Sequence, residues 1–141
     1  RIEKPALLFQ HVIEAREQLY TNKFYGPFMV YTSPDWDAYL DNDYARLGGA
    51  NANMTLRDRI KAIEGIVDVR RLDFMDTETF TMLFVQMTSD VARAVNGLEI
   101  TTVQWPTVGG MRLNFKVMTI KVPQLRSDYS GNAGILQATT A

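Results

Sequence analysis

Residues 111–126, which follow the Gly109-Gly110 pair, carry the most informative pattern of apolar and polar positions in the chain. Apolar side chains first occupy one set of alternate positions, Leu113, Phe115 and Val117. They then shift by one residue to the other set, Met118, Ile120 and Val122. A period of two is typical of a β-strand, and a one-residue shift indicates a bulge or a change of packing partner. We therefore predict one long strand that serves two packing environments.

Helical periodicity and capping residues predict four helices. A stripe formed by Leu8, Val12, Ala15 and Leu19 indicates a helix over about residues 4–20. Ser33-Pro34-Asp35 is a helix start, with Ser as N-cap and Pro in the first turn. Thr55 with Asp58 approximates a capping box, and Gly65 is expected at the C′ position of that helix. Thr88-Ser89-Asp90 is expected to start a short helix that ends near Asn96-Gly97.

Shorter strands are expected between these helices. They cover residues 28–32, 67–74, 80–87 and 98–105. The dense apolar run from Met82 to Val85 predicts a strand that is buried on both faces. Helices mixed with short strands and tight connections favour an α+β fold with a mixed, largely antiparallel sheet flanked by helices. The polar residues 127–141 are expected to form a loosely held tail.

Composition limits the classes of function. The 141 residues include 46% hydrophobic positions, which suits one globular domain. There are 15 basic and 16 acidic residues, a balance that argues against a general nucleic-acid footprint. The absence of cysteine excludes disulfides, thiolate nucleophiles and Cys-based zinc sites. No apolar run reaches the roughly 18 residues that span a membrane. The sequence starts at Arg1, with neither an initiator Met nor a signal peptide, which suggests a fragment.

Candidate catalytic and phosphate-binding features are weak. His11 is the only histidine, and no Ser or Cys partner is identifiable for it from the sequence. Neither Gly48-Gly49 nor Gly109-Gly110 is followed by the Lys-Ser/Thr of a phosphate-binding loop, so both pairs are interpreted as turns. We predict no catalytic residues, no bound cofactor or metal, and no enzymatic activity.

Two alternatives from other classes of function stay open. One is a small ligand-binding or hydrolytic domain that uses a divalent cation at Asp35, Asp37, Asp41 and Asp43. The other is an adaptor that contacts nucleic acid through Arg57, Arg59, Lys61, Arg70 and Arg71. Neighbouring acidic residues offset these basic residues locally, which is more typical of salt links or of a solvated surface.

A family resemblance rests on three features: the sequence of residues 24–36, in which a strand leads into a helix start, the helix that ends near Gly65, and the strand over residues 115–124. The sequence of residues 24–36 is Phe24-Tyr25-Gly26-Pro27-Phe28-Met29-Val30-Tyr31-Thr32-Ser33-Pro34-Asp35-Trp36. Together these features resemble the C-terminal half of tailed-phage major capsid proteins, whose fold is shared with encapsulin nanocompartments. The resemblance implies the end of a spine-like helix over residues 1–22 and an axial-domain-like core over 23–105. It also implies a return strand over 106–126 that re-enters the peripheral domain, followed by the polar tail 127–141.

The function that this resemblance implies is structural. We expect a subunit, or a fragment of one, that associates with copies of itself to form an icosahedral virus or phage capsid. It would be located in the virion, be assembled in the host cytoplasm and make no membrane contact. Non-specific contact with packaged DNA is also expected. The polar loop over residues 41–54 is the candidate contact at the centre of a capsomer. Its predicted interface residues, with two neighbours from the next helix, are Tyr44, Arg46, Leu47, Asn51, Arg57 and Arg59. Charge reversal at Arg57 and Arg59 is expected to impair assembly and leave the isolated domain folded.

Overall fold

A computed structural model describes residues 5–42, 54–75 and 81–139 of the chain. The helices are α1 (Pro5–Thr21), α2 (Pro34–Leu40) and α3 (Leu56–Lys61). The strands are β1 (Phe28–Thr32), β2 (Ile66–Arg71), β3 (Thr81–Gln86), β4 (Ala92–Pro106), β5 (Leu113–Leu125) and β6 (Ile135–Thr139). The fold class is α+β, as predicted.

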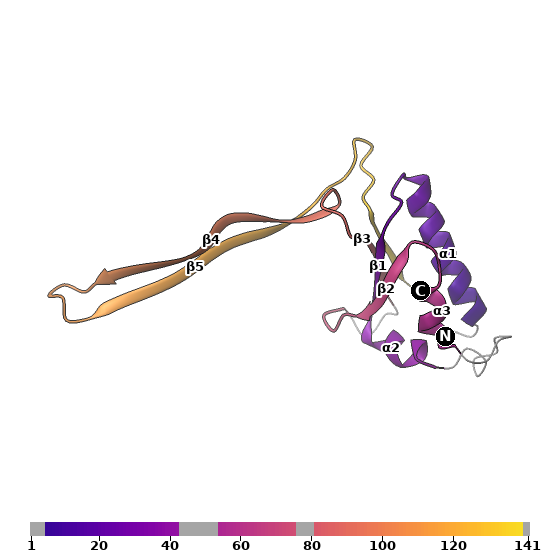
Figure 1. The fold of residues 1–141 in the computed structure, drawn as a ribbon, viewed down its shortest axis with the longest axis horizontal. Coiled ribbons are helices and arrows are strands. Elements are labelled where there is room, and N and C mark those ends of the chain that lie inside the picture. Colours follow the sequence, from indigo (N-terminus) through magenta and orange to yellow (C-terminus); the bar gives the residue numbers. More distant parts are fainter. Residues whose placement is uncertain (1–4, 43–53, 76–80, 140–141) are drawn as a thin grey trace.

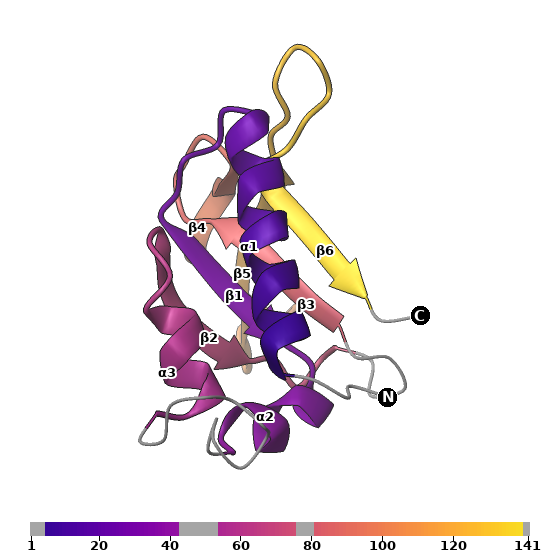
Figure 2. The ribbon, with the colours of Figure 1, turned by 90° about the vertical axis from the view of Figure 1, so that its right-hand side faces the viewer.

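Two sheets organise these strands. Four strands form a mixed sheet in the order β2-β1-β3-β6, in which β1 and β2 are parallel and the other neighbours are antiparallel. Helix α1 lies across one face of this sheet (Figure 2). Strands β4 and β5 form a separate antiparallel pair that extends far from the side of the sheet opposite α1 (Figure 1). We call residues 92–125 the arm and the other described residues the body.

The hydrophobic core lies between the helices and the four-stranded sheet. Helix α1 buries the predicted stripe of Leu8, Val12, Ala15 and Leu19. The sheet contributes Phe28, Val30, Val69, Met82 and Phe84 to the same cluster, and α2 and α3 contribute Trp36, Leu40, Leu56 and Ile60. Burial of apolar surface between two layers is the main favourable term in folding, so the body has the architecture of a self-supporting domain.

The starts of the two short helices follow their capping residues. Helix α2 begins at Pro34 after Ser33, whose backbone is extended as expected for an N-cap. The hydroxyl oxygen of Thr55 accepts a hydrogen bond from the backbone N–H of Asp58 and so caps α3. The predicted role of Gly65 is wrong, because α3 ends at Lys61 with Ala62 as its C-cap. Gly65 instead has a φ of +91°, and a Cβ there would lie 2.8 Å from the Tyr20 hydroxyl.

The predicted helix between Thr88 and Gly97 is wrong. Only one turn forms, in which the N–H groups of Val91 and Ala92 both donate to the carbonyl oxygen of Thr88. From Ala92 the chain is a strand that pairs with β5 up to Pro106. The local helix-start signal is overridden because β5 supplies cross-strand hydrogen-bond partners for this segment.

The expected loose tail is also wrong over residues 135–139. This segment is strand β6, which pairs with β3 from Val85↔Ile135 to Thr81↔Thr139. Leu136 and Ala138 pack against the core. The segment is ordered because β3 provides hydrogen-bond partners and α1 lies against it, where Leu136 and Ala138 reach the core.

The phase shift in β5 has a different cause from the predicted one. The register of the β4–β5 pair shifts between Asn96 and Leu98 and again between Leu98 and Thr101, and at each shift β4 carries the extra residue. Strand β5 therefore alternates without interruption along its length, always with β4 as its partner. The two sets of apolar residues lie on opposite faces of the arm, and β5 does not move between two packing environments within the described chain.

Candidate functional site

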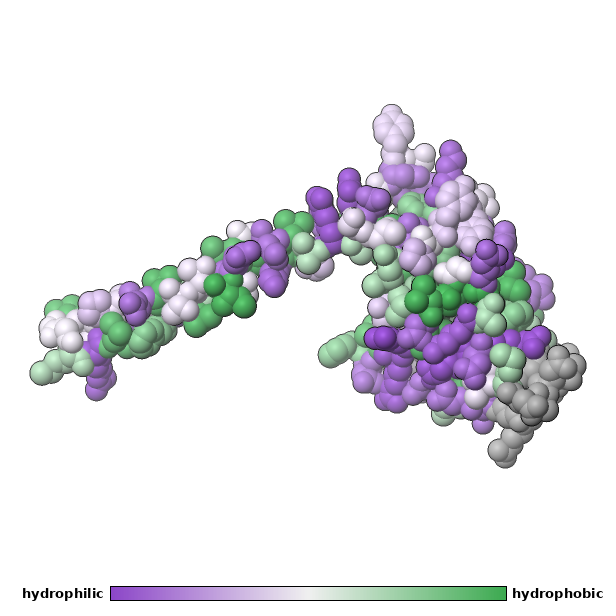
Figure 3. All heavy atoms as spheres, in the orientation of Figure 1, coloured by the Kyte–Doolittle hydropathy of each residue, from purple (hydrophilic) through white to green (hydrophobic). Residues whose placement is uncertain are grey.

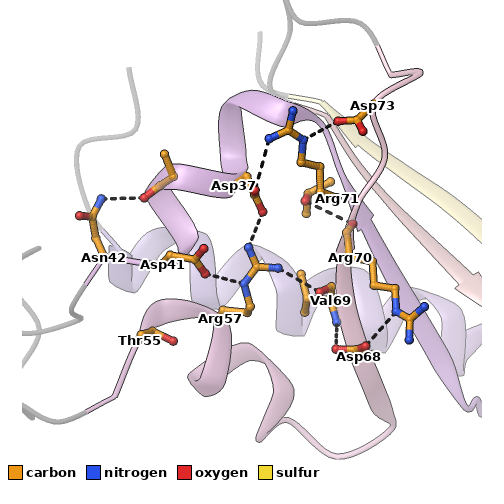
Figure 4. Close-up of polar contacts among 12 residues, drawn as sticks. Asp37, Asp41, Asn42, Thr55, Arg57, Asp68, Val69, Arg70, Arg71 and Asp73 are labelled. Carbon is orange, nitrogen blue, oxygen red and sulfur yellow. Dashed lines mark hydrogen bonds and ion pairs between the residues drawn. The ribbon is translucent and has the colours of Figure 1, made fainter.

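Arg57 joins three elements of the body. Its Nε donates to Asp41 Oδ1 at 2.6 Å, just after α2, and its Nη1 donates to the Val69 carbonyl oxygen on β2 at 3.1 Å. Its Nη2 donates to Asp37 Oδ1 on α2. Figure 4 shows the guanidinium between these partners. Since the Arg57 side chain is only 17% exposed, this network is part of the packing between α2, α3 and β2.

Further ion pairs extend the network along β2. Arg71 contacts Asp37 at 3.5 Å and also pairs with Asp73, and Asp68 pairs with Arg70 at 3.0 Å (Figure 4). Asp68 also pairs with Lys61 at 2.7 Å. The hydrogen bond from Arg57 holds the pKa of Asp37 below its ordinary value. The hydrogen bond from Lys61 does the same for the pKa of Asp68. These carboxylates are stabilised in their charged form by cationic side chains of the same chain.

This arrangement does not favour the divalent-cation alternative. Asp37 and Asp41 already bind the Arg57 guanidinium, and Asp35 lies in the first turn of α2. Asp43 is outside the described residues. Among the residues that the structure describes, no three His, Cys, Asp or Glu side chains are grouped so that they could hold a metal ion.

The predicted capsomer contact is only partly described. Tyr44, Arg46, Leu47 and Asn51 lie outside the described residues. Arg57 and Arg59 both lie on α3, where Arg57 holds the network above and the Arg59 guanidinium lies 5.4 Å from the centre of the Phe9 ring on α1. Both arginines thus contact side chains of their own chain. Their role in subunit contacts stays a prediction, but charge reversal at Arg57 is now expected to destabilise the body.

His11 lies beside an open depression of about 380 Å³ between α1, α2, β3 and β6. The described lining is largely apolar and includes Leu8, Trp36 and Met82. It contains no carboxylate, so no acid lines it that could orient His11 as a general base.

The arm is the largest exposed apolar feature of the described chain. Every residue of β4 and β5 is exposed or half-buried. Its exposed large apolar side chains are Val95, Ile100, Val103, Trp105, Val108, Met111, Leu113, Phe115, Val117, Ile120, Val122 and Leu125. Figure 3 shows apolar side chains along the arm, interspersed with polar ones. A two-stranded ribbon is at best marginally stable in water without a cover, so this surface is suited to packing against a further partner.

Both faces of the arm carry apolar side chains. Paired residues on β4 and β5 share a face, so Val122 lies with Val95, Ile120 with Leu98, and Met118 with Thr101. Val103, which pairs with Lys116, and Trp105, which pairs with Asn114, lie on the same side nearer the tip of the arm. We call this side the long face. The outer half of the arm comprises residues 101–117. On its other face lie Leu113, Phe115 and Val117, and we call these three residues the outer patch.

Sequence reasoning identified β5 but not the arm. The alternation of β5 was visible, whereas the Thr88-Ser89-Asp90 signal concealed the first half of β4. The useful signal was the symmetry around Gly109-Gly110, because long stretches rich in β-branched residues lie on both sides of this turn.

Comparisons with known proteins bear on this fold. A model described as "Family of unknown function (DUF6260)" matches residues 4–138. The chain belongs to this family. No curated protein sequence matches it. None of the helices in the described ranges has the length and apolar character that a membrane crossing requires.

A solved structure has a similar fold. It is the virus-like particle from Pyrococcus furiosus, with a TM-score of 0.58 and 19% sequence identity. The match covers 87% of this chain and 48% of that chain, so this chain spans about half the length of that protein. The similarity shows that the described chain has a fold found in a particle-forming protein.

Proposed function

We propose that this chain is part of a structural subunit of a virus or phage capsid and that it acts by self-association into a closed shell. Its role is mechanical rather than catalytic. The same proposal places the protein in the virion after assembly in the host cytoplasm. Non-specific contact with packaged DNA stays a prediction.

The observation that carries this proposal is the arm. Large apolar side chains are exposed on both of its faces, although the body of the same chain has a well-buried core. An exposed apolar surface of this kind lowers the solubility of a protein unless a binding partner covers it. The fold that this chain shares with a virus-like particle protein supports a shell as the product of that association.

Shell assembly does not require strong single contacts. Each subunit contacts several neighbours, so modest interfaces add up through multivalency. Weak contacts also let misplaced subunits dissociate before the shell closes. The loop over residues 41–54, with Arg59, is proposed as an additional contact between subunits at the centre of a capsomer.

The test is to express the complete natural gene product that contains this chain and measure its mass by light scattering and its shape by electron microscopy. We expect closed particles of uniform diameter. A protein that stays monomeric at all accessible concentrations, and in the presence of the other proteins encoded beside it, contradicts the proposal.

A further inference from the structure

We propose that the outer patch of the arm, Leu113, Phe115 and Val117, binds to the body of a second copy of this chain. This inference rests on the proposed shell function and adds a specific contact to it. It concerns the outer half of the arm and the face opposite the long face.

The geometry of the arm keeps the outer patch away from its own body. Leu125 pairs with Ala92 at the root of the arm, and Val117 lies eight residues farther along β5. At about 3.3 Å per residue this places the outer patch more than about 25 Å from the root. Figure 1 shows that the arm points away from the sheet and from α1. The described body of the same copy therefore does not cover the outer patch.

One segment packed on one face of the arm cannot also bury the apolar side chains on the other face. The long face runs along most of the hairpin and includes Val95, Ile120 and Val122. A segment that packs on the long face leaves the outer patch in water, where Leu113, Phe115 and Val117 are 51%, 62% and 65% exposed. The outer patch thus needs a second partner, independent of whatever covers the long face.

Charge favours a second copy as that partner. The arm has four basic residues, Arg93, Arg112, Lys116 and Lys121, and one acidic residue, Glu99. The rest of the chain has the remaining eleven basic and fifteen acidic residues. A positively charged arm and a negatively charged remainder attract each other between copies and repel like parts, which favours contact of arm with body over contact of arm with arm. The apolar outer patch then supplies the buried area of the contact.

Photo-cross-linking identifies the partner directly. Phe115 is replaced by p-benzoylphenylalanine in the complete gene product, assembled particles are irradiated, and the products are analysed on denaturing gels and by peptide mass spectrometry. We expect covalent dimers with the cross-link in the body of the second copy. Cross-links within one copy, or between two arms, overturn the inference.

Matched variants measure the importance of the contact. Phe115→Asp and Val108→Asp each add one negative charge to the outer half of the arm, but Val108 lies in the turn beyond the paired residues of both strands. We expect Phe115→Asp to raise the concentration needed for assembly at least tenfold, as for a typical central contact residue, and Val108→Asp to change it by less than about threefold. Phe115→Thr retains the preference for a strand and is expected to behave like Phe115→Asp, which separates loss of contact from loss of the hairpin.

The outcomes separate this inference from the proposed function. Wild-type protein that does not assemble overturns both. Wild-type particles with equally good assembly of the Phe115 variants overturn the outer-patch contact and leave the shell function standing. Equal defects in Phe115→Asp and Val108→Asp also overturn the contact, because an interface at the outer patch cannot respond equally to a charge in the turn.

Discussion

The body and the arm are built from the same kinds of residue but bury them differently. Among the described residues, every buried apolar side chain lies between Leu8 and Val91, in the body. Strands β4 and β5 contain no buried residue. The body has a helical layer over its sheet, so apolar side chains from two layers cover each other. The arm is a single layer of two strands, and among the described residues both of its faces are exposed to solvent.

This difference indicates where the stability of each part originates. The body has its own core, whereas no described part of the chain covers the arm, and under the proposed function a partner supplies that cover. The same type of side chain is therefore buried in the body and exposed on the arm, where we propose that it serves association. The predictions below compare matched positions in the two parts, measured on dissociated subunits.

The largest contrast is expected between two phenylalanines in strands. Phe84→Ala in β3 removes a side chain that is 1% exposed and is expected to lower the free energy of unfolding by about 3–5 kcal/mol. Phe115→Ala in β5 removes one that is 62% exposed and is expected to cost less than about 1 kcal/mol. Chemical denaturation of both variants measures the difference. Equal losses would show that the arm belongs to the same core as the body.

A second contrast uses two glycines with the same backbone conformation. Gly65 in the body has a φ of +91°, and Gly109 at the tip of the arm has a φ of +92°. A Cβ at Gly65 would lie 2.8 Å from the Tyr20 hydroxyl, whereas a Cβ at Gly109 has no neighbour within 4 Å. The rings of Tyr25 and Phe28 lie against Tyr20 and restrict its movement.

Gly65→Ala is therefore expected to cost about 2–3 kcal/mol from backbone strain and crowding together. Gly109→Ala is expected to cost about 1 kcal/mol from strain alone. Thermal unfolding of the two variants tests this. A larger effect at Gly109 would contradict the described packing of Gly65 against α1.

A third contrast concerns the ion pairs of the body. Arg57 holds the pKa of Asp37 below its ordinary value of 3.8, so the charged carboxylate stabilises the folded state above that pH. This stabilisation is lost as the pH falls below 3.8 toward the lower pKa of the folded state. Asp37→Asn is expected to cost about 1–2 kcal/mol near pH 7 and much less near pH 2.5.

Urea denaturation of wild type and Asp37→Asn at the two pH values measures this change. The arm offers the control, because Glu99 lies on β4 and has no ion pair with a described residue of this chain. Glu99→Gln, measured in the same way, is the matched variant that removes a carboxylate without removing an ion pair of the described chain. A pH-independent cost at Asp37 would indicate that its role is in helix capping or packing rather than in charge.

Much of the body could be predicted from local signals. Ser33-Pro34 and Thr55 set the starts of α2 and α3, and the apolar run from Met82 to Val85 gave a strand within a sheet. These signals work because capping and burial depend on residues close in sequence or on strong periodicity. Strand β6 was missed because its apolar pair, Ile135-Leu136, lies within a stretch of mostly small and polar residues, and only pairing with β3 makes the segment a strand.

The candidate site shows the same division. The sequence indicated acidic and basic residues around positions 35–73 but not their pairing, which depends on α2, α3 and β2 meeting at Arg57. The shift at Val117-Met118 was visible, but its meaning depended on the register with β4. Since the extra residues lie in β4, the shift places apolar side chains on opposite faces of one ribbon.

The sequence by itself determined which segments are apolar, where α2 and α3 begin, and that residues 113–125 form a strand. Only the tertiary structure decided which apolar side chains are buried and which stay exposed. The physical reason is that alternation fixes the face on which a side chain lies, whereas burial depends on whether a second layer covers that face. The body has such a layer in its helices, whereas no second layer among the described residues covers the arm.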